Sequence, residues 1–172
     1  MVAVVGAGHV PGLSKILGKR LEEGAAIYRC IRRIIMNDVY ISDNFKLKEF
    51  ESTDNNLVKV DKKLVEKLEL LRKKVNEYLN TDDTPIIITS AFRTWKHHKR
   101  IYIEYFGSEW KEHITDESLH LKGKATDLRN PHELTPKKFK ELAEEVGFSG
   151  IGLYSWGIHV DVADRHARWD NR

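Results

Sequence analysis

Hydrophobic residues recur at helical spacing in several parts of the chain. After Asp61, a residue suited to cap a helix N-terminus, one apolar stripe is formed by Leu64, Leu68, Leu71, Val75 and Leu79. Near residue 135, Thr135 precedes Pro136 and an apolar stripe ends just before Gly147, which are typical start and stop signals. We predict amphipathic helices over residues 13–35, 60–80, 94–106 and 134–148.

Shorter patterns between these stretches predict strands. A β-branched run, Ile86 to Ile88, follows turn residues and Pro85, while "KATDL" alternates small and polar positions before Leu128. Two more short segments flank a turn at 155–157. This order predicts an α+β fold, in which helices pack on a small, largely antiparallel sheet.

A polar, turn-rich stretch around Ser42–Asn44 separates the first predicted helix from the rest. We therefore expect an N-terminal helical extension over residues 1–43 and a domain over residues 44–172. Basic residues cover the polar faces of that first helix. It is expected to pack on the domain or on a partner chain, and so to mediate self-association; binding at a membrane surface is the alternative.

Composition limits the classes of function. The 29 basic residues exceed the 26 acidic ones by too little to indicate nucleic-acid binding, and the small excess favours an anionic partner. Cys30 is the only cysteine, so any metal site must use His, Asp and Glu.

No stretch is long enough for stable membrane insertion. The start "MVAVVGAGHVPG" lacks basic residues. We expect a protein that is cytoplasmic as synthesised, or exported without a classical signal peptide to act at the cell wall.

Two histidine–aspartate pairs are candidates for chemistry. His120 and Asp127 stand seven positions apart with small residues between them, and in "GIHVD" His159 and Asp161 face one side of a strand. His120, Asp127 and His159 would make three ligands of a tetrahedral Zn²⁺, with the fourth position left for water. The spacing also fits ordinary structural roles. His120 would then be a loop histidine, Asp127 a helix cap or ion-pair partner, and His159 a core histidine.

Several motifs resemble one family. "SLHLKGKATD" matches the pattern S-x-H-x-x-G-x-A-x-D. It resembles the signature of the zinc D-alanyl-D-alanine carboxypeptidases, a family that includes L-alanyl-D-glutamate endolysin peptidases and shares the hedgehog-type fold. "GIGLYSWGIHVDV" is similar to the family's second metal motif, "ITSAFRT" to its SGYR element and "FKLKEF" to the start of one branch. The resemblance runs from about residue 44 to residue 170.

The resemblance implies a zinc peptidase that uses metal-activated water on a bond of peptidoglycan stem peptides, as a D-Ala-D-Ala carboxypeptidase or a murein endopeptidase. It implies one Zn²⁺ on His120, Asp127 and His159. Arg93 would bind the substrate carboxylate or the oxyanion, although it could be a surface arginine. Ser118 and Tyr154 are expected to contact substrate. The alternative is that the Ser118 hydroxyl stabilises a turn and that Tyr154 packs against its neighbours.

The sequence departs from the family pattern at one position. Many members carry a glutamate as general base three residues before the last histidine ligand, where this chain has Trp156. Asp161 is the candidate base, with orientation of an imidazole as its alternative role. A non-catalytic zinc-binding interaction module of the same fold is the alternative function. The adjacent His97 and His98 are expected to face solvent, and Trp169 to lie in the core.

Overall fold

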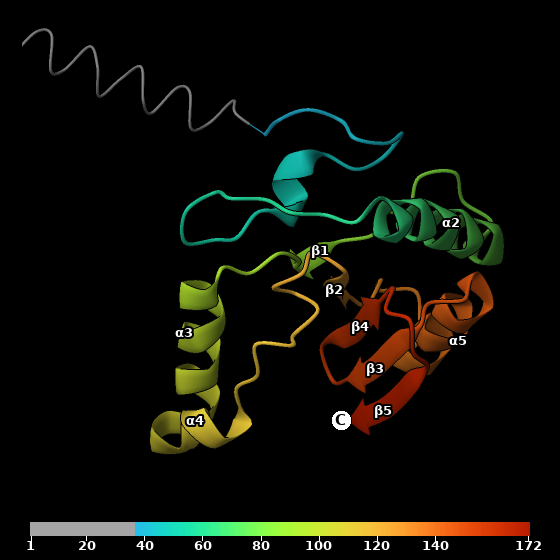
Figure 1. The fold of residues 1–172 in the computed structure, drawn as a ribbon. Coiled ribbons are helices and arrows are strands. Elements are labelled where there is room, and N and C mark those ends of the chain that lie inside the picture. The colour runs from blue at the N-terminus through green and yellow to red at the C-terminus, as the bar shows by residue number, and fades with distance from the viewer. Residues whose placement is uncertain (1–36) are drawn as a thin grey trace, which may run out of the picture. The chain divides into compact units, whose positions relative to one another are not determined.

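The computed structural model describes residues 37–172 (Figure 1). The helix predicted over residues 13–35 and Cys30 lie outside the described residues, and the domain boundary at 43/44 stays a prediction. Two short 3-10 turns occur, at Leu47–Phe50 and Gly107–Glu109. The helices are α2 (Lys62–Leu79), α3 (Trp95–Phe106), α4 (Trp110–His113) and α5 (Pro136–Val146). The strands are β1 (Ile88–Ser90), β2 (Ala125–Arg129), β3 (Gly150–Tyr154), β4 (Gly157–Asp161) and β5 (Ala167–Asn171).

The strands form one small mixed sheet in the order β1-β2-β4-β3-β5. β1–β2, β2–β4 and β4–β3 are antiparallel, and β5 runs parallel to β3. The predicted α+β class is confirmed. The sequence prediction missed β5, because "ARWDN" is short and mostly polar, with Ala167 and Trp169 as its only apolar residues.

The core lies between the sheet and two helices. α5 packs on β3 and β4, and α2 packs on α5. The buried stripe of α2 meets Phe139 of α5 and Ile151 and Ile158 of the sheet in one hydrophobic cluster. The predicted caps are present, since Asp61 accepts from the backbone N–H of Lys63 and Thr135 from that of Lys138.

α3 and α4 lie on the left of Figure 1, away from α2 and α5 on the right. The prediction that His97 and His98 face solvent is wrong, because both side chains are buried. His97 lies between the hydroxyls of Ser52 and Thr53, and His98 Nε2 donates to the Thr115 carbonyl at 3.1 Å. The loop with Ser52 and Thr53 and the loop with Thr115 therefore cover the start of α3. Helical periodicity alone does not reveal this cover.

The prediction that Trp169 lies in the core is also wrong. It is half-buried on β5, where its ring lies over Gly152 and 5.3 Å from the ring of His159. Its indole N–H donates to the hydroxyl of Tyr154 at 3.0 Å. Over residues 37–172, no helix combines the length and the apolar composition that crossing a bilayer would require.

Candidate metal centre

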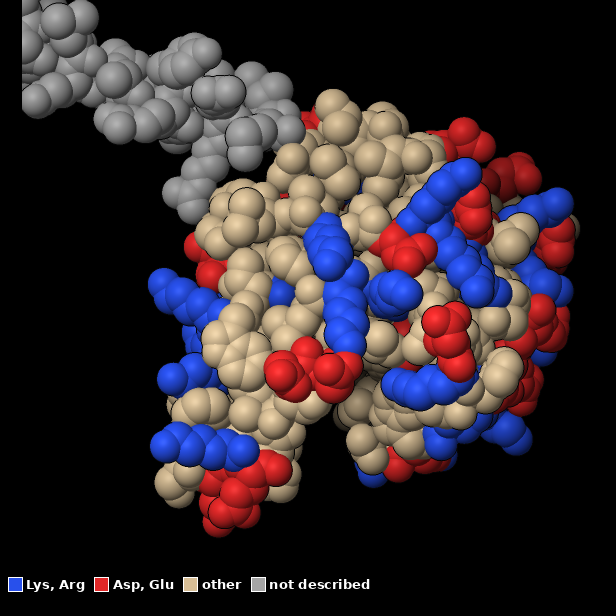
Figure 2. Space-filling model, in the orientation of Figure 1, with Lys and Arg blue, Asp and Glu red and all other residues tan. Residues whose placement is uncertain are grey.

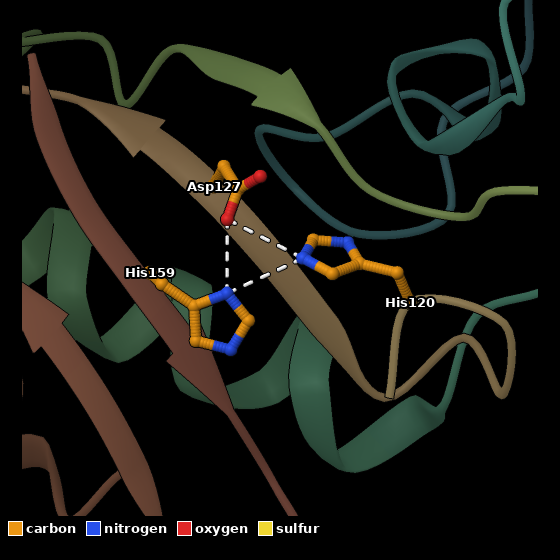
Figure 3. Close-up of side chains that lie close together, drawn as sticks. All are labelled: His120, Asp127 and His159. Carbon is orange, nitrogen blue, oxygen red and sulfur yellow. Dashed lines mark hydrogen bonds and ion pairs between the residues drawn. The ribbon is translucent and has the colours of Figure 1, made fainter. Parts of the chain in front are cut away.

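Three side chains from distant parts of the chain meet at one point (Figure 3). Asp127 on β2 and His159 on β4 are direct partners across the antiparallel ladder. His120 comes from the loop before β2, and its ring turns back toward them. His120 Nε2 lies 3.3 Å from Asp127 Oδ1 and 3.3 Å from His159 Nδ1, and His159 Nδ1 lies 2.9 Å from Asp127 Oδ1.

The segment after β1 holds His120 from two sides. The Ala91 carbonyl accepts a hydrogen bond from His120 Nδ1 at 2.6 Å, and the backbone N–H of Arg93 donates to the His120 carbonyl at 3.2 Å. Because the Nδ1 proton is used in this bond, the lone pair of Nε2 points toward Asp127 and His159. Gly123 completes the loop with φ +69°, where an added Cβ would lie 2.4 Å from the Lys59 carbonyl oxygen.

Asp161 stands behind His159, on the side away from Asp127. Its Oδ2 lies 3.7 Å from His159 Nε2, which is longer than a hydrogen bond, so the attraction is electrostatic. The carboxylate is fully buried, and its Oδ1 accepts from the backbone N–H groups of Gly150 and Ala163. Gly150 makes this possible, because a Cβ there would lie 2.0 Å from Asp161 Oδ2. Asp161 therefore favours a proton on Nε2 and a lone pair on Nδ1 of His159.

The charges around the cluster favour a cation. Burial raises the pKa of Asp127, but His120 and His159 outweigh it and hold this pKa well below its ordinary value. Burial lowers the pKa of His159, yet the carboxylates of Asp127 and Asp161 outweigh it and raise this pKa. Burial lowers the pKa of His120. An ionised carboxylate and two inward nitrogens thus favour positive charge between them, from a proton or a metal ion.

The donor set and its spacing fit a metal ion. The ligand atoms offered by His120, Asp127 and His159 all lie within 4.8 Å of one another. Tetrahedral Zn²⁺ with bonds of about 2.0–2.1 Å would separate its ligand atoms by about 3.3 Å, close to the separations found here. Two histidines and one carboxylate are also the donor types that zinc accepts. The three residues could therefore hold one metal ion.

Arg93 is built into the centre. Its Nη2 donates to Asp127 Oδ2 at 2.5 Å, and its Nε donates to Ser90 Oγ at 2.9 Å. The side chain is 12% exposed, so it is not the surface arginine that the sequence left open. By binding the second oxygen of Asp127, Arg93 leaves Oδ1 directed at the histidines.

The cluster lies in the wall of an open cleft of about 890 Å³. α3 supplies one side with Tyr102, Tyr105 and Phe106, and the β3–β4 hairpin with β5 supplies the other. Figure 2 shows a notch between the lobe of α3 and α4 and the lobe of the sheet. The remaining lining residues include Ser118, Tyr154, Trp156, Arg165 and Trp169. Ser118 and Tyr154, predicted to contact substrate, thus lie in the cleft with the cluster.

Sequence reasoning missed several contributors to this site. The Ala91 carbonyl has no side-chain signature, and Ser90 stood in a motif from which only Arg93 was selected. Arg165 and Trp169 line the cleft because β5 returns beside β3. The "GIG" of β3 was an available signal, since glycines facing one side of a strand indicate something close above it.

Two histidines and a carboxylate that converge in an open cleft of an α+β domain define a candidate metal-binding domain. A family model described as peptidase M15 matches residues 43–163, which cover most of the chain and include all three residues of the cluster. The chain belongs to this family of zinc-dependent DD-peptidases, and it is accordingly a metallopeptidase. A search of curated proteins finds no match.

Proposed function

We propose that this protein is a zinc peptidase that hydrolyses a peptide bond in peptidoglycan stem peptides, as a D-Ala-D-Ala carboxypeptidase or a murein endopeptidase. The observation that carries the proposal is the convergence of His120 Nε2, His159 Nδ1 and Asp127 Oδ1 in the wall of an open cleft. Membership of the M15 family supports the same chemistry. With this substrate, the protein would be cytoplasmic as synthesised, or exported without a classical signal peptide to act at the cell wall.

His120, Asp127 and His159 would hold the ion. Zn²⁺, when bound, supplies a Lewis acid and lowers the pKa of water. Arg93 orients Asp127 through a hydrogen bond to Oδ2, and its place in the cleft suits the binding of a substrate carbonyl or carboxylate oxygen. Ser118 and Tyr154 would contact the peptide on either side of the cluster.

Asp161 has two proposed roles, general base and orienting residue, and its surroundings support the second. A general base must come within hydrogen-bond reach of the water that it deprotonates. Asp161 is fully buried, and its Oδ2 faces His159 Nε2 and Arg165 Nη2. We propose that Asp161 positions the imidazole of His159. Asp161 does not line the cleft; among the described residues that do, the carboxylates are Asp127 and Glu117.

One observation favours the alternative function, a non-catalytic zinc-binding module. Trp156 occupies the position where many family members carry the base, and Asp161 stands behind a ligand. A protein that binds zinc and a peptide without hydrolysis would have the same cluster.

Metal content and digestion products test the proposal together. The purified protein should contain one zinc per chain by mass spectrometry of the metals, His120→Ala should lose it, and His132→Ala, at an exposed histidine outside the cluster, should keep it. Incubation with muropeptides should release stem-peptide fragments detectable by mass spectrometry. Zinc-loaded protein that leaves every stem-peptide bond intact would favour the binding module, and a wild type without zinc would refute both functions.

A further inference from the structure

We propose that Arg165 determines substrate specificity by binding a carboxylate of the peptide substrate. Arg165 lies in the loop between β4 and β5 and lines the same cleft as the His120–Asp127–His159 cluster. The inference rests on the proposed peptidase function, because it concerns the peptide that this cleft would receive.

Arg165 is weakly engaged within the described part of the chain. The one polar partner found for it there is Asp161, whose Oδ2 lies 3.5 Å from Arg165 Nη2, and its side chain is 53% exposed. A guanidinium carries five N–H donors in a planar fork, so one long contact leaves most of them available to a ligand. A carboxylate matches that fork with two parallel hydrogen bonds.

The other arginines near the sheet are more strongly engaged within the protein. Arg93 is 12% exposed and donates to Asp127 and Ser90. Arg168, the second residue of β5, donates to Glu144 and to three backbone carbonyls. Among the described residues that line the cleft, Arg93 and Arg165 are the arginines and no lysine joins them. Arg165 is therefore the cation best placed to meet a ligand.

The arrangement of charge also favours an acidic substrate. Arg93 is paired with Asp127 and Arg165 with Asp161, so each arginine offsets one aspartate. Glu117, at the cleft, is paired with Lys122. A divalent ion would therefore give the centre a net positive charge, and an anionic peptide would be favoured over a neutral one.

The two arginines pair with different carboxylates beside the His159 ring. Nδ1 of that ring lies by Asp127, which pairs with Arg93, whereas Nε2 lies by Asp161, which pairs with Arg165. A peptide that crosses the cluster would meet Arg165 at a distance from the carbonyl undergoing attack. Arg165 would then affect which peptide binds rather than the rate of the chemical step.

A stem peptide offers two sources of this carboxylate: its C-terminus and the α-carboxyl group of the γ-linked D-glutamate. The test uses the pentapeptide L-Ala-γ-D-Glu-L-Lys-D-Ala-D-Ala with both groups free, or with either group amidated. The zinc-loaded full chain should prefer the peptide in which the relevant carboxylate is free. Arg165→Gln should raise KM for that peptide by about tenfold or more, leave kcat little changed, and remove the preference over its amide.

Arg100→Gln is the matched control. Arg100 on α3 has the same side-chain exposure, 53%, and a similar long ion pair with Glu104 at 3.8 Å, but it does not line the cleft. It should leave KM and the preference unchanged. Arg165→Lys keeps the charge without the fork and should retain part of the preference.

Calorimetric titration of the same peptides into zinc-free protein gives a second readout that does not depend on turnover. Weaker binding of the free-carboxylate peptide by Arg165→Gln, with no change for the amide, supports the proposal. An equal loss for acid and amide, or an unchanged preference in either assay, overturns it. A wild type that binds the acid selectively but cleaves neither peptide would instead refute the peptidase function and leave the role of Arg165 standing.

Discussion

Each imidazole of the centre is fixed by a partner on the side away from the cluster. The Ala91 carbonyl holds Nδ1 of His120, and the carboxylate of Asp161 faces Nε2 of His159. The two rings consequently present different nitrogens, Nε2 and Nδ1, to the same point. Such outer partners set the tautomer and the ring orientation of a metal ligand.

Asp161→Asn should lower zinc affinity by about 10–100-fold. The asparagine oxygen can keep the bonds from Gly150 and Ala163, but the amide N–H₂ would then face His159 Nε2–H. Two donors would then face each other. The imidazole of His159 avoids this by carrying its proton on Nδ1 in place of Nε2, so Nδ1 no longer has a lone pair to offer to zinc. Competition with a chromophoric chelator measures the affinity.

Glu117→Gln is the control for this variant, because it removes an exposed cleft carboxylate without touching the cluster. It should leave zinc affinity unchanged. If Asp161→Asn kept its zinc affinity and lost only turnover, Asp161 would be the general base after all.

Much of this local chemistry was predictable from sequence. The pattern in "SLHLKGKATD" and "GIHVD" located the three candidate ligands, and Gly123 adopts the bend expected between His120 and Asp127. The orientation of His159 by Asp161 was one of two roles left open. To choose between the two roles, one must know that Asp161 is buried and where its oxygens point. The spacing of residues along the chain does not give this information.

At the level of elements, α3 holds the loop that carries His120. His98, buried on α3, donates from Nε2 to the Thr115 carbonyl, five residues before His120. Its Nδ1 finds no hydrogen-bond partner among residues 37–172. The ring packs between Trp95 and Tyr102 along the helix.

This histidine predicts acid sensitivity of the fold. Burial lowers the pKa of His98 from 6.5 to about 4, so the unfolded chain binds its proton first as the pH falls. The stabilisation that neutral His98 contributes is complete above about pH 6.5 and is lost toward pH 4. The resulting fall in the free energy of unfolding is at most about 3 kcal/mol. His98→Gln keeps a donor for Thr115 but cannot titrate.

Urea unfolding of zinc-free protein at pH 7 and pH 4.5 measures the effect. The free energy of unfolding should fall more between these values for the wild type than for His98→Gln. Equal losses would mean that His98 does not contribute to acid sensitivity.

Helices were easier to predict than strands and short segments. The caps Asp61 and Thr135 and the apolar stripes defined α2 and α5. α4 spans only Trp110–His113, too short to show a period, and β5 is defined by its pairing with β3 rather than by its own residues.

For the whole molecule, the core of the described part is built by residues between Phe45 and Val162. The segment before it is joined to the domain by an isolated bridge, Tyr40 with Lys46, and by ion pairs from Asp38 to Lys46 and Lys48. These partners are partly exposed, and exposed ion pairs contribute about 0–1 kcal/mol.

A chain that starts at Asn37 should therefore unfold cooperatively and bind one zinc. A chain that starts at Asn44, the predicted boundary, should do the same with its free energy of unfolding lower by about 1–3 kcal/mol, since the two backbone hydrogen bonds of the bridge are lost with the ion pairs. Thermal unfolding by circular dichroism and zinc stoichiometry check both. Failure of the longer chain to fold would show that residues 1–36 are needed by the domain.

The sequence by itself determined the α+β class, the main helices and the identity of the three candidate ligands. Periodicity, caps and residue chemistry act over a few positions, so the linear order contains them. Only the tertiary structure decided that Asp161 faces the back of His159, that Arg93 is committed to Asp127, and that Arg165 and Trp169 reach the cleft. These relations depend on strand register and on the packing of segments far apart in the chain, because a side chain's partner is set by which backbones lie beside it.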